Sequence, residues 1–207
     1  MSVTNEPKKS TRLPRPARRA QLLEAARVVF VREGFHAAGM DDIAEKAGVS
    51  KPVLYQHFPS KRDLYMALLD SGKEELIESV TEALSSTENN HERVQASVSA
   101  YFAFVNDDSK SFRLIFESDL YNETAVRQRL QEADEECAVE LMKVITEDTG
   151  TSEEQANLLA YGLIGMARTA ARRWLSSGRV VPNDQAVDLI SRLAWQGISG
   201  VPLNTRT

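Results

Sequence analysis

The sequence predicts an all-α protein, with an N-terminal three-helix domain of the helix-turn-helix kind followed by a larger helical bundle. Apolar residues recur three and four positions apart along nearly the whole chain, and no stretch alternates apolar with polar residues as a strand would. A glycine-containing segment, 48–50, separates two short amphipathic segments and is too short for anything but a tight turn. No sheet is therefore expected.

The individual helices follow from these patterns and from their breaks. The first carries an apolar stripe through Leu22, Ala26 and Phe30 and is expected to close at Gly34, which favours a left-handed C-cap. Later breaks are indicated by glycine, proline and clustered polar residues. The helices are expected at about 17–33, 40–47, 51–57, 61–84, 91–106, 109–119, 123–148, 152–177 and 184–198.

Charge is distributed unevenly along the 207 residues. The net charge is -5, yet residues 1–63 carry 12 Lys and Arg against 7 Asp and Glu, and the other 144 carry 13 against 23. A basic part can neutralise DNA phosphates, whereas an acidic part is repelled by DNA. The asymmetry indicates two parts with different roles. The expected division is a basic flexible arm (1–15), a DNA-binding domain (16–76, with the helix-turn-helix at about 39–58) and a C-terminal domain (77–207), to which the family resemblance described below assigns regulation and dimerisation.

Several protein classes are disfavoured by composition. No apolar run approaches the roughly 18 residues of a membrane helix, and the polar, basic N-terminus does not resemble a secretory signal, so a cytoplasmic protein is expected. A single cysteine, Cys137, excludes an internal disulfide and a cysteine-based zinc cage. Scattered histidines and the lack of a glycine-rich phosphate loop argue against an enzyme, so no catalytic residue, metal or cofactor is expected.

The segment 40–58 carries the most specific pattern in the chain. Its apolar residues Ile43, Ala44 and Ala47 are spaced to face inward, and Gly48 permits the sharp turn after a helix. Ser50 is placed to cap the next helix, in which Leu54 and Phe58 point inward. The outward residues, whose donors, amide and small apolar groups suit a DNA groove, are Lys51, Pro52, Val53, Tyr55, Gln56 and His57.

With this pattern the stretch from about residue 17 to 69 resembles the TetR family of regulators. The matching positions are Ala44, Ala47, Gly48, Val49, Ser50, Leu54, Tyr55, His57, Phe58 and Lys61. The resemblance implies a DNA-binding set of Ser50, Lys51, Pro52, Val53, Tyr55, Gln56, His57 and Lys61. Within this set it places Lys51, Pro52, Val53 and Gln56 nearest the bases, and Tyr55, His57 and Lys61 on phosphates.

Three details of the N-terminal part bear on this resemblance. Gly39 departs from the usual Ser or Thr at its cap position, and Asp42 can compensate only in part. Asp41 stands where some relatives place a DNA-contacting cation, so it is left out of the contacts. The arm basic residues Lys8, Lys9, Arg12 and Arg15 either reach the minor groove and flanking phosphates or form a solvated tail.

The segment 153–176 is apolar nearly all round and needs cover on both sides. One bundle covers one side, so we expect a second subunit on the other, completed by the last helix into a four-helix seam. The predicted seam residues are Ile164, Ala167, Ala171, Trp174, Leu189 and Leu193. Such a homodimer would present two reading helices about 34 to 36 Å apart to a roughly palindromic operator.

The remaining helices are rich in aromatic and aliphatic residues, which form either plain core or the lining of an apolar effector pocket. The predicted lining is Phe102, Val105, Phe112, Ile115, Phe116, Leu120, Leu141, Leu163 and Met166. Most of the chain also resembles actinobacterial regulators of fatty-acid synthesis within the TetR family, which implies a long-chain acyl-CoA effector. The cations that could meet CoA phosphates, or instead form solvated ion pairs, are Arg113, Arg168, Arg172 and Arg173.

The function predicted from the sequence is a ligand-responsive transcriptional regulator of lipid or fatty-acid genes, with repression as the family default. One alternative is a TetR-type regulator of efflux or another pathway with a different hydrophobic effector. A second is a lipid-binding helical bundle with no specific DNA role, which would leave the outward set of 51–57 unexplained. A nonspecific DNA-packaging protein is disfavoured because most of the chain is acidic.

Overall fold

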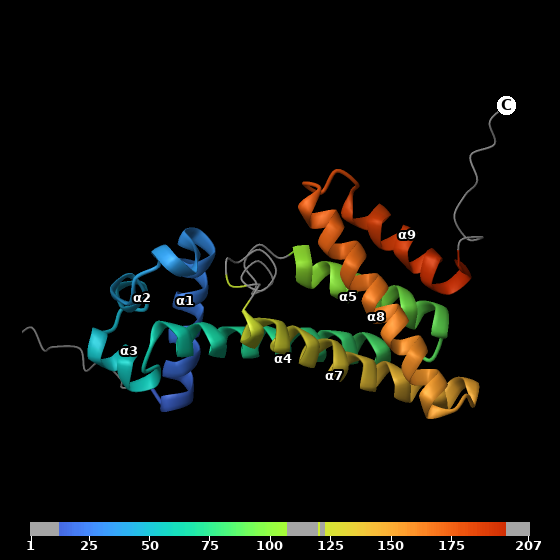
Figure 1. Cartoon of the computed structure of the whole chain (residues 1–207), viewed down its shortest axis with the longest axis horizontal. Coiled ribbons are helices and arrows are strands. Elements are labelled where there is room, and N and C mark those ends of the chain that lie inside the picture. The colour runs from blue at the N-terminus through green and yellow to red at the C-terminus, as the bar shows by residue number, and fades with distance from the viewer. Residues whose placement is uncertain (1–12, 107–119, 121–122, 198–207) are drawn as a thin grey trace, which may run out of the picture.

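The computed structural model describes residues 13–106, 120 and 123–197, and within these ranges every regular element is a helix. The helices are α1 (Arg15–Ala37), α2 (Met40–Lys46), α3 (Lys51–His57), α4 (Lys61–Ser85), α5 (Asn90–Asn106), α7 (Thr124–Thr149), α8 (Glu153–Ser176) and α9 (Asn183–Gln196). The all-α prediction is confirmed, and the helix expected at 109–119 lies outside the described residues. Figure 1 shows α1–α3 at one end of an elongated molecule and the bundle at the other.

The N-terminal helices α1, α2 and α3 enclose the first of two buried cores. Leu22, Phe30, Ile43 and Leu54 are almost wholly buried in it, together with residues from the first half of α4. α1 is longer than expected, because a turn of helix continues beyond a kink at Gly34, whose φ is 76°. Glycine adopts this left-handed conformation without steric cost, so the sequence indicated the position of the break.

The long helix α4 joins the two parts of the molecule (Figure 1). Its first turn is capped by Ser60, whose hydroxyl accepts a hydrogen bond from the Asp63 amide at 3.1 Å. Leu64 belongs to the first core, whereas Leu84, five turns further on, belongs to the second. At 1.5 Å per residue its 25 residues span about 37 Å. One rigid element therefore contacts both cores.

The second core lies among the end of α4 and helices α5, α7, α8 and α9. α8 begins with a capping box, in which Ser152 and Gln155 exchange hydrogen bonds of 3.2 and 3.3 Å. Its buried face is built largely from alanines, which let it pack closely against neighbouring helices. None of the helices within the described ranges combines the length and hydropathy that crossing a membrane would require.

Ion pairs fasten the first half of α7 along α4. Arg62 contacts Glu123 at 2.6 Å, and Lys73 contacts Glu136 at 2.8 Å. A third pair joins Arg129 to Asp70 at 3.0 Å. Partly exposed pairs of this kind contribute little stability individually, and they accompany the packing of α7 on α4. α7 is thereby attached to the helix that enters the N-terminal domain.

Candidate functional site

The turn between α2 and α3 positions the outward helix. Gly48 adopts a φ of 65°, and the half-buried side chain of Val49 packs against the first core. Ser50 stands at the N-cap of α3 in an extended conformation, but its side chain accepts no capping hydrogen bond, so the capping prediction is wrong. With only seven residues, α3 depends on tertiary packing, because a short isolated helix is unstable in water.

α3 has one buried side and one solvent-facing side. Leu54 is 0% exposed and Phe58 is buried at the C-cap. The other side carries the six outward residues of the sequence prediction, of which Val53 and His57 are half-buried. We call this set the reading face, and its members are Lys51, Pro52, Val53, Tyr55, Gln56 and His57. The geometry leaves these side chains accessible to a groove, while their contact with DNA stays a prediction.

Two lysines of the predicted DNA-binding set have partners within the protein. Lys51 Nζ lies 2.8 Å from Asp41 Oδ1, which ties the start of the reading face to α2. Lys61 Nζ donates to the carbonyl oxygens of His36 and Ala38 at 3.1 and 2.9 Å. Lys61 therefore holds the end of α1, and only part of its donor capacity remains for a phosphate.

The cap of α2 explains the glycine that departs from the family pattern. The Gly39 amide donates to Asp42 Oδ2 at 3.2 Å, which satisfies one backbone donor of the first turn. A Cβ added at Gly39 would lie 2.5 Å from the same oxygen. Glycine thus leaves room for the folded-back carboxylate of Asp42, which a side chain at this position would displace.

Arginines at the start of α1 extend the positive surface beside α3. The Arg19 guanidinium lies 4.4 Å from the centre of the Phe58 ring. Burial, together with the positive charges of Arg15, Arg19 and Arg18, lowers the pKa of His57. The predicted site did not include Arg18 or Arg19, although their clustering in the sequence was a usable signal.

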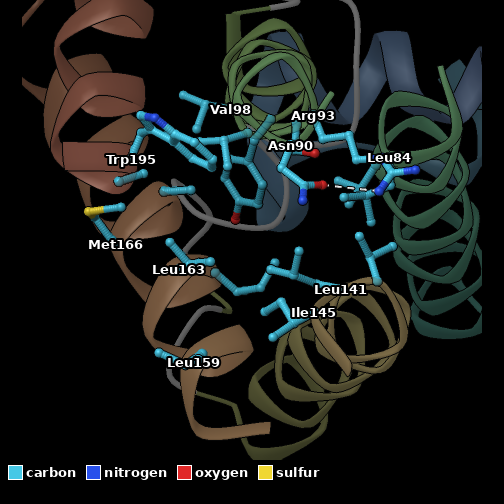
Figure 2. Close-up of a pocket in the computed structure, with 18 of the residues that line it drawn as sticks. Leu84, Asn90, Arg93, Val98, Leu141, Ile145, Leu159, Leu163, Met166 and Trp195 are labelled. Atoms are coloured by element: carbon cyan, nitrogen blue, oxygen red, sulfur yellow. Dashed lines mark hydrogen bonds between the residues drawn. The ribbon is translucent and has the colours of Figure 1, made fainter. Parts of the chain in front are cut away.

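The bundle contains a partly open cavity of about 360 Å³, within the range of small-molecule sites. Its apolar lining comes from α4, α5, α7, α8 and α9, and Figure 2 shows the side chains converging on the space. Three predicted lining residues, Leu141, Leu163 and Met166, border it. The other cavity residues named in Figure 2 are Leu84, Asn90, Arg93, Val98, Ile145, Leu159 and Trp195.

Other predicted lining residues lie elsewhere. Phe102 and Val105 are buried in the second core and do not border this cavity, and the Phe102 ring packs 5.5 Å from that of Trp174. Leu120 packs in the first core. Their assignment to this cavity is corrected for a physical reason, since apolar spacing does not distinguish core from cavity wall. Three further predicted residues, Phe112, Ile115 and Phe116, lie outside the described residues.

The polar groups of the cavity lie near the start of α5 and the end of α7. Arg93 Nη1 contacts Asp148 Oδ2 at 2.7 Å and Asn90 Oδ1 at 3.1 Å. Ser97 also borders the cavity, one helical turn further along α5. Burial raises the pKa of Tyr101, so its hydroxyl remains neutral. Sequence reasoning missed this polar set, because α5 attracted attention for its aromatic residues.

The arginines considered for CoA phosphates do not border the cavity. Arg168, Arg172 and Arg173 line a separate cleft between α7 and α8, and Arg113 lies outside the described residues. Arg168 forms an ion pair with Asp134. The ion-pair alternative raised by the sequence is therefore the one observed for Arg168.

The predicted dimer seam needs correction. Ile164, Ala167, Ala171 and Trp174 are buried within the subunit, so their side chains cannot also cover a partner. Leu189 is exposed and Leu193 half-buried. Because α8 is apolar on several faces, its sequence did not identify which face turns inward. The exposed large apolar residues of α8 and α9 are Leu158, Leu159, Tyr161, Leu189 and Trp195.

The helix-turn-helix, its exposed reading face and the attached bundle define the class of DNA-binding transcriptional regulators. Comparison with known families agrees with this class. Bacterial regulatory proteins of the tetR family match residues 22–68, and the tetracyclin repressor-like C-terminal domain matches residues 90–197. The chain belongs to the TetR family, whose members are regulators rather than enzymes, bind operator DNA, dimerise and respond to small molecules.

Individual relatives give a closer comparison. The chain is 45% identical over 196 residues to the HTH-type transcriptional activator FasR of Mycolicibacterium smegmatis, covering 95% of this chain and 90% of that protein. A TetR-like regulator from Rhodococcus sp. RHA1 is 29% identical, with a TM-score of 0.69 over 92% of this chain and 100% of that one. FadR from Bacillus subtilis, solved with stearoyl-CoA, has the same fold, with 21% identity and a TM-score of 0.68 over 86% of this chain and 98% of that one.

Proposed function

We propose that this regulator controls genes of fatty-acid or lipid metabolism and takes a long-chain acyl-CoA, or a related apolar molecule, as its effector. The observation that carries the proposal is the cavity of about 360 Å³ lined by apolar side chains from five helices. An aliphatic chain moved from water into such a space gains about 0.8 kcal/mol per methylene. The resemblance to regulators of fatty-acid synthesis, and the fold shared with a FadR solved with stearoyl-CoA, support a lipid pathway rather than an efflux system.

The direction of regulation that we propose is activation. The family default predicts repression, but a relative covering 95% of this chain is named a transcriptional activator. The regulator acts in the cytoplasm as a homodimer on a roughly palindromic operator, with one α3 of each subunit in the major groove. In this arrangement Gln56 reads base edges, and Tyr55 and His57 contact phosphates.

Exposed apolar residues support a dimer formed through α8 and α9. Leu158 is 75% exposed, and Tyr161 and Leu189 are also exposed. Exposed apolar groups of this size on neighbouring helices mark interaction surfaces. The seam that we propose therefore uses the outward face of α8 together with Leu189 of α9.

The effector signal would travel through α4 and α7. α7 contributes Leu141 and Asp148 to the cavity, and its first half is attached by ion pairs to α4. α4 in turn belongs to the core that supports α3. A ligand that shifts α7 would change the angle of α4 and hence the separation of the two reading faces.

Operator binding measured with acyl-CoA of increasing chain length tests the proposal. A duplex selected from a random pool by the protein serves as operator, and binding is followed by fluorescence anisotropy. Effector affinity should rise about fourfold per added methylene until the cavity is full. Loss of every preferred site at high salt would favour the lipid-carrier alternative, and a specific operator without any acyl response would favour a different effector.

A pair of substitutions on α7 supplies the matched control. Leu141 borders the cavity, whereas Val139 on the same helix is exposed. Leu141→Arg should abolish the acyl response and leave operator binding intact, while Val139→Arg should retain both. An equal acyl response in the two variants would contradict the placement of the effector in this cavity.

A further inference from the structure

Polar side chains form a line along the cavity face of α5. Arg93, Ser97 and Tyr101 are spaced four residues apart, and each borders the cavity. Residues at this spacing occupy the same side of a helix, with Cβ atoms about 5–6 Å apart. Figure 2 shows Asn90 and Arg93 on the side of the cavity beside Leu84, opposite Met166 and Trp195. The cavity thus has a polar end and an apolar end.

The Arg93 guanidinium has donors that its protein partners do not use. Its Nε donates to the Thr87 carbonyl oxygen at 2.7 Å, and Nη1 contacts Asn90 and Asp148. A guanidinium carries five N–H groups, and the two on Nη2 take no acceptor among the described residues. The Arg93 side chain is only 18% exposed. The protein partners thus fix the position of the Arg93 guanidinium, while its two Nη2 donors can still bind an oxygen acceptor in the cavity.

Ser97 supplies a second, independent signal. Its Oγ atom is buried and has no hydrogen-bond partner in the part of the chain that the structure describes. A buried hydroxyl without a partner is unfavourable, so native proteins satisfy such groups with a ligand or water. The hydroxyl lies one helical turn from Arg93 along the same wall. The two groups can bind neighbouring atoms of one polar head.

We propose that Arg93 and Ser97 bind the carbonyl end of a long-chain acyl ligand, whose hydrocarbon chain lies toward Leu163 and Met166. The guanidinium and the hydroxyl donate to the acyl carbonyl oxygen, present in a fatty-acid carboxylate and in an acyl thioester. This inference rests on the proposed function, and it adds the residues and the orientation that select the ligand. Asp148 competes with the ligand for Arg93, because both offer oxygen acceptors to the same guanidinium.

Ligands that share a chain and differ in the head test the proposal. Binding of dodecanoate, dodecanoyl-CoA and submicellar dodecyltrimethylammonium to the full chain is measured by isothermal titration calorimetry. Arg93→Leu should weaken dodecanoate binding at least tenfold, about 1.4 kcal/mol, and should not weaken binding of the cationic ligand. Ser97→Ala should weaken both carbonyl ligands. A larger loss for dodecanoate than for dodecanoyl-CoA identifies the carboxylate as the preferred head, and the reverse identifies the thioester.

Asp148→Asn tests whether Arg93 binds the ligand head or only forms a structural ion pair with Asp148. Both Arg93→Leu and Asp148→Asn remove the Arg93–Asp148 pair, but only the second leaves the guanidinium in place. Asp148→Asn should therefore strengthen dodecanoate binding while Arg93→Leu weakens it. Lys143→Leu, which removes a cation on the exposed side of α7, is the control and should change neither.

Two failures are distinguishable. If the wild-type protein binds none of the carbonyl ligands, the proposed function itself is overturned. If it binds them and Arg93→Leu and Ser97→Ala bind them equally well, only the assignment of the polar end is overturned. If Arg93→Leu and Asp148→Asn both weaken dodecanoate binding, the assignment of the polar end is also overturned, because the Arg93–Asp148 ion pair would then only stabilise the structure.

Discussion

Substituting Leu54, the buried residue of α3, distinguishes residues that support α3 from residues that contact DNA. Leu54 is 0% exposed, and Leu→Ala changes at such positions cost about 2–5 kcal/mol through lost burial and a residual cavity. Against domain stabilities of about 5–15 kcal/mol, a loss of this size should lower the unfolding midpoint of Leu54→Ala clearly. Tyr55, its neighbour, is 40% exposed, and Tyr55→Phe removes only the hydroxyl, so this change should alter stability by no more than about 0.5 kcal/mol.

Two measurements check this contrast. Urea unfolding followed by circular dichroism gives the free energy of unfolding, and fluorescence anisotropy with the selected operator gives the affinity. Leu54→Ala should lose stability, and on heating it should lose operator binding at a lower temperature than the wild type. Tyr55→Phe should lose affinity for all sequences at unchanged stability. An unfolding free energy of Leu54→Ala within about 0.5 kcal/mol of wild type would refute the claim that tertiary packing holds α3.

Three further predictions follow from the described contacts. Asp41→Asn releases the Lys51 ammonium and removes a negative charge beside the reading face, so operator affinity at low salt should rise and should fall more steeply with added salt; an unchanged salt dependence would contradict this. The lowered pKa of His57 keeps it neutral in the unbound protein, and a nearby phosphate favours its protonated form. Operator affinity should therefore rise as the pH falls from neutrality toward the lowered pKa of His57, and His57→Gln should flatten that dependence in anisotropy measurements. Phe102→Ala should cost about 3–5 kcal/mol in thermal unfolding as a core residue, and a stability loss below 1 kcal/mol would refute its placement.

Local patterns were sufficient for the reading face. The turn at Gly48 and the inward pair Leu54 and Phe58 follow from helical spacing and from glycine's access to positive φ, and the structure has them as expected. The same logic failed for the Ser50 cap, because a suitable residue at an N-cap need not adopt the rotamer that accepts the bond. Arg19 of α1 joins this surface only because the tertiary fold brings it over the Phe58 ring at the C-cap of α3.

The polar end of the cavity shows what sequence spacing could not supply. Arg93 and Asp148 are 55 residues apart, and their pairing depends on how α5 and α7 pack. Ser97 is an ordinary helical serine in the sequence, and only its burial beside a cavity makes its lack of a partner informative. Side-chain chemistry is local, whereas desolvation depends on every element that surrounds the group.

The sequence by itself determined the helices, their principal breaks and the outward residues of α3, because helical periodicity and turn chemistry depend on near neighbours. It also indicated the TetR family through a motif whose parts are contiguous. Only the tertiary structure decided which face of α8 is buried. Ala171 and Leu158 are both apolar, yet Ala171 is buried and Leu158 is exposed. The packing of α8 against α7 and α5 made that choice, because only one of these faces can be covered within a single subunit.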